Sequence, residues 1–130
     1  MSAAAKTRES VSKAVPLHRF ESRPKVITLC GSTRFWDEFQ RLNAELTLQG
    51  NLVFSVAVTS TQAGGELDPS QKAILDSVHF HKIRMSDEIL VINPGGYIGE
   101  STAREIRYAT EIGRKIDYLE RPADGPLFEN

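Results

Sequence analysis

Short apolar segments alternate with segments of helical periodicity along most of the chain. The apolar segments are Lys25–Cys30, Leu52–Val58, Glu88–Asn93 and Lys115–Leu119, and glycine, proline or polar residues bound each of them. Runs of this length that are rich in apolar and β-branched residues are typical of buried strands. We therefore predict four strands.

Helices are predicted between consecutive strands. The first presents its apolar side chains at helical spacing, at Phe35, Phe39, Leu42 and Leu46. Gly50-Asn51 ends this helix, as glycine commonly does. The second helix begins after Asp68, an N-cap that Pro69 and Gln71 follow at the positions typical of a helix start, and it extends to about Ser86.

The predicted elements alternate between strand and helix through to the last strand. A third helix begins at Ser101 or Thr102, and the residues predicted on its inner face are Ala103, Ile106, Thr110 and Gly113. Helices between short apolar strands imply right-handed crossovers and a parallel sheet covered on both faces. The pattern therefore predicts an α/β domain over residues 24–120 with a doubly wound sheet of four to five strands. A flexible polar arm, residues 1–23, precedes it, and a tail, residues 121–130, follows it.

Composition and charge narrow the classes of function. The 130 residues suffice for one domain. With 16 Lys and Arg against 17 Asp and Glu, no basic excess indicates a nucleic acid polymer as a partner. The single cysteine, Cys30, excludes an internal disulfide and suits a reducing compartment, and no apolar run approaches the ~20 residues that cross a bilayer. We therefore expect a cytoplasmic protein without a membrane or nucleic acid polymer as a partner.

Two loops, Gly31–Arg34 and Pro94–Glu105, follow the carboxyl ends of the first and third predicted strands. Open parallel sheets bind ligands at that edge, so we expect both loops to share one crevice. In the first loop, the amides of a helix start, the hydroxyls of Ser32 and Thr33 and the guanidinium of Arg34 favour an anion such as phosphate. The alternative is an ordinary turn in which Ser32 or Thr33 caps the helix and Arg34 is solvated. The loop matches neither the P-loop nor the dinucleotide-binding motif.

Glycines and a helix start also characterise the second loop. Its glycines, Gly99 among them, let the backbone approach a ligand, and Ser101 and Thr102 stand at a helix N-terminus that favours an anion. Glu105 lies in the first turn of the predicted helix, where the dipole favours the ionised carboxylate that a nucleophile requires. The same spacing fits a capping box from Thr102 to Glu105, in which Glu105 serves only the helix start. The spacing leaves both interpretations open.

Other candidate groups lie outside these loops. His79 is a candidate proton donor or a surface histidine, and Asp87 is a candidate at the crevice edge or a cap of the preceding helix. His79 and His81 point to different faces of the predicted helix and have no Cys or His nearby in the sequence, so we expect no metal site. Cys30 follows an apolar strand and is interpreted as a buried structural thiol.

Three motifs, taken in order, resemble one family of enzymes. They are CGSTR at residues 30–34, SDEILVIN at residues 86–93 and, behind the glycine loop, REIRYATEIGRKI at residues 104–116. Together they resemble the nucleoside 2-deoxyribosyltransferase superfamily over about residues 25–120. The first motif is most similar to that of the 2′-deoxynucleoside 5′-phosphate N-hydrolases. The resemblance implies a flavodoxin/Rossmann-like fold, in agreement with the alternation of strands and helices.

The resemblance also implies roles for individual residues. Glu105 stands at the position of the catalytic nucleophile in the family pattern Glu-x-Gly-x-Ala, with Arg107 in place of the glycine. The family carries an aspartate about eight residues before the position of Asp87, and His79 stands there in this chain. The predicted substrate and phosphate site comprises Gly31, Ser32, Arg34, Gly99, Ser101 and Thr102.

The implied reaction is a double displacement at the anomeric carbon of a nucleotide. Glu105 attacks that carbon as the bond to the base breaks, and His79, Asp87 or Glu100 protonates the leaving base. No metal or organic cofactor is needed, and a homodimer or larger assembly is implied. We therefore predict an N-glycosidic-bond hydrolase that acts on (deoxy)nucleoside 5′-monophosphates. The alternatives are a nucleoside 2-deoxyribosyltransferase and a non-catalytic nucleotide sensor.

Overall fold

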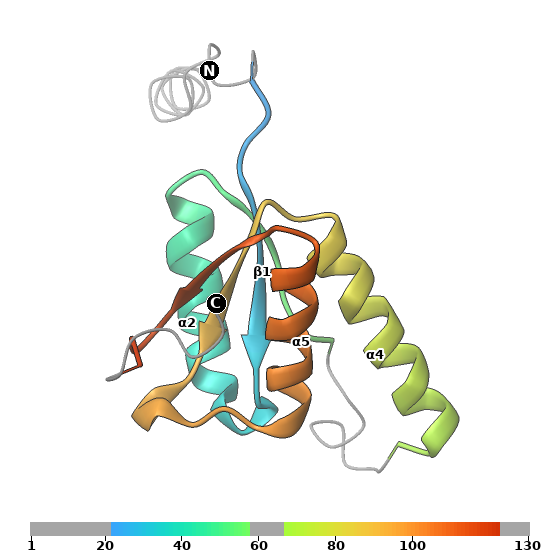
Figure 1. Cartoon of the computed structure of the whole chain (residues 1–130). Helices are drawn as coiled ribbons and strands as arrows, with labels where there is room; N and C mark the ends of the chain where they lie inside the picture. Colours follow the sequence, from blue (N-terminus) through green and yellow to red (C-terminus); the bar gives the residue numbers. More distant parts are fainter. Residues whose placement is uncertain (1–21, 58–66, 123–130) are drawn as a thin grey trace, which may run out of the picture.

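A four-stranded parallel sheet forms the centre of the structure, a computed structural model that describes residues 22–57 and 67–122 (Figure 1). Its strands are β1 (Val26–Gly31), β2 (Leu52–Phe54), β3 (Glu88–Ile92) and β4 (Lys115–Tyr118), in the spatial order β2-β1-β3-β4. Every neighbouring pair is parallel. The predicted α/β fold with a doubly wound parallel sheet is therefore confirmed, and the strand order changes direction between β1 and β3.

Helices cover both faces of the sheet. Helix α2 (Trp36–Leu48) lies on one face, and α4 (Pro69–Arg84) and α5 (Glu100–Glu111) lie on the other (Figure 1). Two short 3₁₀ turns, η2 (Thr33–Phe35) and η3 (Pro94–Gly96), follow β1 and β3. The chain therefore turns sharply at the carboxyl ends of the two central strands.

The core consists of two layers that the central strands separate. Alternate side chains of β1 enter opposite layers, because Leu29 packs against α2 and Cys30 packs against α4 and α5. Neither of these side chains is exposed. The layer on the side of α2 contains Ile27, Leu29, Phe39, Leu42 and Ile92. The layer on the other side contains Cys30, Ile83, Ile89, Val91, Ile106, Ala109 and Tyr118.

The predicted start of α4 is confirmed in detail. The Asp68 carboxylate accepts a hydrogen bond of 2.8 Å from the Gln71 backbone N–H, and the Gln71 side chain accepts one of 3.1 Å from the Asp68 N–H. These bonds form a capping box, with Pro69 in the first helical position. Helix α4 therefore begins where its own sequence directs.

The boundaries of β2 and α5 differ from the prediction. The strand predicted to reach Val58 ends at Phe54, because β2 is an edge strand and pairs only with residues 26–28 of β1. Val58 itself lies outside the described residues. Helix α5 begins at Glu100, before the predicted Ser101 or Thr102, since Gly99 is its N-cap.

The buried face of α5 also differs from the prediction. Its buried residues are Thr102, Ile106 and Ala109, whereas Thr110 and Gly113 are exposed. The earlier start shows that Thr102 is a helical residue, so the face that meets the sheet runs from Thr102 through Ile106 to Ala109.

The structure describes the predicted domain but only a small part of the predicted arm and tail. Residues 1–21, 58–66 and 123–130 lie outside them, so most of the predicted arm and tail is not described. Arg23, at the end of the predicted arm, pairs with Asp87 at 2.7 Å. Within the described ranges, no helix is long and apolar enough to cross a membrane.

Candidate functional site

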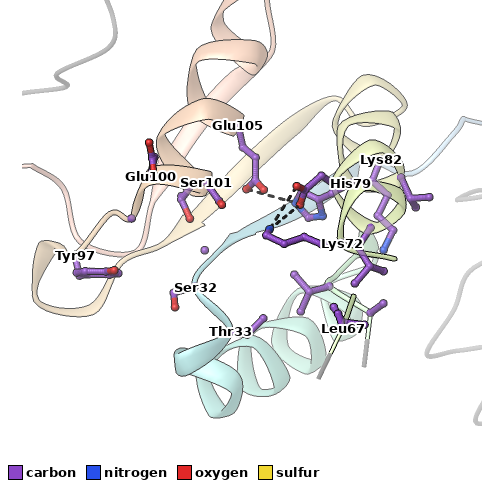
Figure 2. A pocket seen from close by; sticks show the side chains of 18 residues that line it. Ser32, Thr33, Leu67, Lys72, His79, Lys82, Tyr97, Glu100, Ser101 and Glu105 are labelled. Atoms are coloured by element: carbon purple, nitrogen blue, oxygen red, sulfur yellow. Dashed lines mark hydrogen bonds and ion pairs between the residues drawn. The ribbon is translucent and has the colours of Figure 1, made fainter. Parts of the chain in front are cut away.

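A pocket of about 450 Å³ opens at the carboxyl ends of β1 and β3 (Figure 2). Residues from the loop after β1, from the start of α5 and from one face of α4 line it. The structure therefore brings both predicted loops to one pocket, where open parallel sheets bind their ligands. The lining residues that the argument uses are Gly31, Ser32, Lys72, Asp76, His79, Lys82, Gly99, Glu100, Ser101, Thr102 and Glu105.

Two side chains on the floor of this pocket, Glu105 and His79, meet a third reactive group, Cys30, which is buried behind them. Glu105 Oε1 lies 3.7 Å from His79 Nε2, and the exposed fractions of these side chains are 15% and 10%. Cys30 Sγ lies 3.5 Å from the same His79 nitrogen. Cys30 is fully buried in β1, His79 comes from α4 and Glu105 comes from α5. Residues far apart in the sequence thus form one cluster, which we call the floor cluster.

Burial changes the protonation of the floor cluster. It raises the pKa of Glu105 to about 7, and a hydrogen bond with the Cys30 thiol offsets part of this rise. Burial, with the nearby charge of Lys82, lowers the pKa of His79 to about 4, and burial raises the pKa of the Cys30 thiol well above its usual value. At neutral pH the histidine is therefore uncharged, and its contact with Glu105 is not an ion pair. The predicted structural thiol is buried as expected, but it also contacts the pocket floor.

The position of Glu105 on α5 corrects two expectations. The N-cap is Gly99, so Glu105 lies in the second turn of the helix and not in the first. Thr102 is itself helical and buried, so the capping box from Thr102 to Glu105 does not form. The expectation that the helix dipole favours the ionised carboxylate is also wrong, because burial makes the Glu105 carboxyl group harder to ionise. The carboxyl group faces the pocket and does not cap the helix.

One side of the pocket carries amides and hydroxyls. It is lined by Gly31, Ser32, Gly99, Ser101 and Thr102, which are five of the six residues predicted to bind substrate or phosphate. Within the described segments, no side chain caps the start of α5, so its first amides have no side-chain acceptor. Ser32 Oγ accepts a hydrogen bond of 3.2 Å from Arg34 N, so it caps η2 while it lines the pocket.

Arg34, the sixth of these residues, lies outside the pocket. Its guanidinium stacks over the Tyr97 ring, 4.2 Å from the ring centroid, and the residue lines a separate surface depression. Tyr97 does line the pocket, so the Arg34 guanidinium stacks on a lining residue without lining the pocket itself.

Asp87 lies at the opposite end of the sheet from the pocket. It directly precedes β3, and the pocket lies beyond the carboxyl end of that strand. Its carboxylate accepts hydrogen bonds from Val26 N at 2.8 Å and from the Arg23 guanidinium at 2.7 and 3.0 Å. Hydrogen bonds from Arg23 and Val26 lower the pKa of Asp87 to about 2. The expectation that Asp87 lies at the edge of the crevice is therefore wrong. The residue instead links the amino ends of β1 and β3 through its hydrogen bond with Val26.

The chain shares its fold with a transferase of deoxyribose. A structure of a 2-deoxyribosyltransferase from Leishmania mexicana is similar to it, with a TM-score of 0.56 and 17% identity over 76% of this chain and 68% of that one. A conserved protein from Enterococcus faecalis is also similar, with a TM-score of 0.52 and 20% identity over 78% of this chain and 66% of that one. No protein-family model and no curated protein sequence matches the chain.

Helix α4 contributes polar pocket residues that the sequence analysis did not single out. Lys72, Asp76 and Lys82 line the pocket together with His79. Lys72 Nζ lies 3.4 Å from Asp76 Oδ1, and Lys82 Nζ donates a hydrogen bond of 2.6 Å to the Ser55 carbonyl. The intervals of four, three and three residues place all of them on one helix face. That spacing was visible in the sequence, but nothing in it showed which face meets the pocket.

The site therefore combines three chemical features. A buried carboxyl group with a raised pKa lies on its floor, hydroxyls and free amides line one side, and lysines and an aspartate line the side of α4. A carboxylate in such a place can act as a nucleophile, and the hydroxyls and amides can hold an anion.

Proposed function

We propose that this protein hydrolyses the N-glycosidic bond of (deoxy)nucleoside 5′-monophosphates, with Glu105 as the nucleophile. The observation that carries the proposal is the Glu105 carboxyl group on the floor of the pocket, with a pKa of about 7 and a free path to a ligand. The fold shared with a deoxyribosyltransferase structure supports chemistry at the anomeric carbon of a nucleoside or nucleotide. The hydroxyls and free amides near the start of α5 support a phosphate on the substrate.

The two unlike walls of the pocket orient the proposed substrate. The 5′-phosphate lies against Ser32, Ser101 and the first amides of α5, and the base extends toward the face of α4. Val56 and Leu75 line the pocket and provide apolar surface for the base. This orientation places the anomeric carbon between the walls, above Glu105, and the distant phosphate contacts supply positioning energy.

The reaction proceeds in two displacements. The ionised Glu105 attacks the anomeric carbon as the bond to the base breaks, through an oxocarbenium-like transition state. We assign proton transfer to the leaving base to Asp76, because it lines the wall of α4 and lies one helical turn from His79. Water then cleaves the glycosyl ester on Glu105 and passes its proton to Asp76, which releases the sugar phosphate and restores both the Glu105 carboxylate and the protonated Asp76. His79, uncharged at neutral pH, borders the nucleophile.

A base-release assay with a matched pair of variants tests the proposal. Each ribo- and deoxyribonucleoside 5′-monophosphate is incubated with the wild-type protein, with Glu105→Gln and with Glu111→Gln. Glu111 is an exposed glutamate at the end of the same helix and does not line the pocket, so it controls for the substitution itself. We expect free base from the wild type and from Glu111→Gln, and a loss of at least ~10³-fold in Glu105→Gln.

The other outcomes of this assay identify the alternatives. A new nucleotide in tubes that also contain an acceptor base would assign the protein as a transferase. Equal base release by Glu105→Gln and the wild type would exclude Glu105 as the nucleophile. Nucleotide binding by calorimetry without any turnover would indicate a sensor.

A further inference from the structure

The floor cluster joins three different kinds of metal ligand. A thiol, an imidazole nitrogen and a carboxylate oxygen from Cys30, His79 and Glu105 all lie within 4.8 Å of one another. The Sγ to Nε2 distance is 3.5 Å and the Nε2 to Oε1 distance is 3.7 Å. Each ligand comes from a different element of the core, β1, α4 and α5, so the packing of the fold sets their spacing.

We propose that Cys30, His79 and Glu105 bind one divalent ion of the zinc class. Tetrahedral zinc, with Zn–S of about 2.3 Å and Zn–N of about 2.0–2.1 Å, places sulfur and nitrogen roughly 3.5 Å apart. The observed separation of Sγ and Nε2 has this value, and the Nε2 to Oε1 distance of 3.7 Å exceeds the roughly 3.4 Å of a tetrahedral site by a few tenths of an ångström. The fourth ligand position faces the pocket, because both His79 and Glu105 line it.

The donor set selects the class of ion. Thiolate and imidazole favour zinc and related transition metals, whereas magnesium and calcium prefer sites made only of oxygen ligands. A thiolate and a carboxylate also balance the two positive charges of the ion, which matters in a buried place where an unbalanced charge is costly. Binding releases the Cys30 thiol proton to the solvent, together with the Glu105 proton where that group is protonated.

If the proposed function is correct, bound metal should inhibit the enzyme. The ion occupies the Glu105 oxygen that attacks the sugar, so zinc inhibits base release. The binding itself does not depend on the proposed reaction, because it requires only the three ligands and their spacing. Metal binding and catalysis can therefore be tested separately.

Cobalt titration of the full chain tests the binding. Cys30 is the only cysteine of the chain, so a sulfur-to-cobalt charge-transfer absorption reports this one thiolate. We expect the band to saturate at one Co²⁺ per chain and to disappear when Zn²⁺ is added. Absence of the band at millimolar cobalt, or a thiolate band that Glu105→Gln and His79→Ala leave unchanged, would overturn the proposal.

Matched variants show whether the whole cluster binds the ion. His79→Ala and Glu105→Gln should each weaken cobalt binding at least tenfold. His81→Ala, an exposed histidine on the same helix, should bind like the wild type. Glu105→Gln preserves the shape of the side chain, and circular dichroism of every variant verifies folding, so loss of binding in folded Glu105→Gln cannot come from a collapsed core.

The experiments distinguish failure of the proposed hydrolysis from failure of the proposed metal site. If no nucleotide is cleaved but the cobalt band forms and depends on Glu105, the metal site stands and the proposed function fails. If nucleotides are cleaved and no thiolate band forms, the reaction stands and the metal site fails. If both occur but saturating Zn²⁺ leaves base release unchanged or raises it, the inhibitory role is wrong.

Discussion

Glu105 combines burial with access to the pocket. Its carboxyl group lies 3.7 Å from His79 Nε2 on the pocket floor, and desolvation disfavours its ionised form, which raises its pKa to about 7. A carboxylate with this pKa is a better nucleophile than a solvated one, but a smaller fraction of it is ionised at neutral pH. Under the proposed function, this residue sets the pH dependence of activity, and its burial affects the stability of the fold.

The rate of base release should rise with pH through the pKa of Glu105. Only the ionised carboxylate attacks, so kcat/KM for a nucleoside monophosphate should increase with a midpoint near pH 7, where the Glu105 pKa lies. Initial rates measured between about pH 5 and pH 9 check this. A midpoint near the ordinary glutamate value of ~4.3 would show that Glu105 is solvated in the working enzyme.

Glu105→Gln should stabilise the protein at alkaline pH while it abolishes activity. The folded-state pKa of Glu105 is raised from 4.5 to about 7, so ionising the buried group costs stability as pH rises through this interval. The variant should therefore exceed the wild type by roughly 3 kcal/mol at about pH 8, and the two should converge below about pH 4.5. Thermal unfolding of both proteins at the two pH values measures the difference. A gap that is independent of pH would contradict the assignment.

At the scale of elements, strand ends and helix starts create the pocket. Gly31 ends β1 beside Ile92 of β3, and a side chain there has almost no room, because a Cβ atom would lie 2.7 Å from the Ile92 carbonyl oxygen. Gly99 leaves α5 without a side-chain cap. Glycines at both positions bring the backbone close to any bound ligand.

Gly31→Ala should therefore destabilise the fold and disturb the site. The added methyl group forces β1 and β3 apart at the pocket, at a cost of roughly 1–3 kcal/mol and with reduced nucleotide affinity. Gly113→Ala is the control, since Gly113 has a positive φ of 79° but open space around it. Chemical denaturation and nucleotide titration measure the two effects. An equal loss of stability in both variants would attribute the effect to backbone strain and not to the contact with Ile92.

At the scale of the whole molecule, the pocket exists only where β1, α4 and α5 meet. The residues of the floor cluster are separated by dozens of positions in the sequence, and only the crossing of these elements joins them. The same packing separates residues that a motif joins, because Ser32 lines the pocket and Arg34, two positions later, does not.

Ser101→Ala and Arg34→Ala should affect substrate binding differently. Ser101 lines the wall assigned to the phosphate, so its loss should raise KM about tenfold for a nucleoside monophosphate and little for the nucleoside. Arg34 stacks on Tyr97 outside the pocket, so its loss should change both KM values by similar small factors. Steady-state kinetics with the paired substrates check this. A selective loss of monophosphate binding in Arg34→Ala would mean that the side chain moves into the pocket when substrate binds.

The sequence by itself determined the local structure and the general place of the site. The order of strands and helices and the capping box at Asp68 follow from periodicity and capping chemistry, which act between residues near in sequence. The position of both loops follows from a general rule, that open parallel sheets bind ligands at the carboxyl ends of their strands. Single boundaries were less predictable, because Gly99 starts α5 without a side-chain signal and β2 ends at Phe54 while its partner β1 continues to Gly31.

Only the tertiary structure decided which side chains share the pocket. It placed Asp87 at the far end of the sheet, stacked Arg34 on Tyr97 outside the pocket and brought Lys72 and Asp76 of α4 to the site. It also placed Cys30 and His79 against Glu105, so desolvation raised the carboxyl pKa that the helix start alone was expected to lower. Side-chain direction and burial depend on contacts between distant segments, and periodicity along the chain carries no record of those contacts.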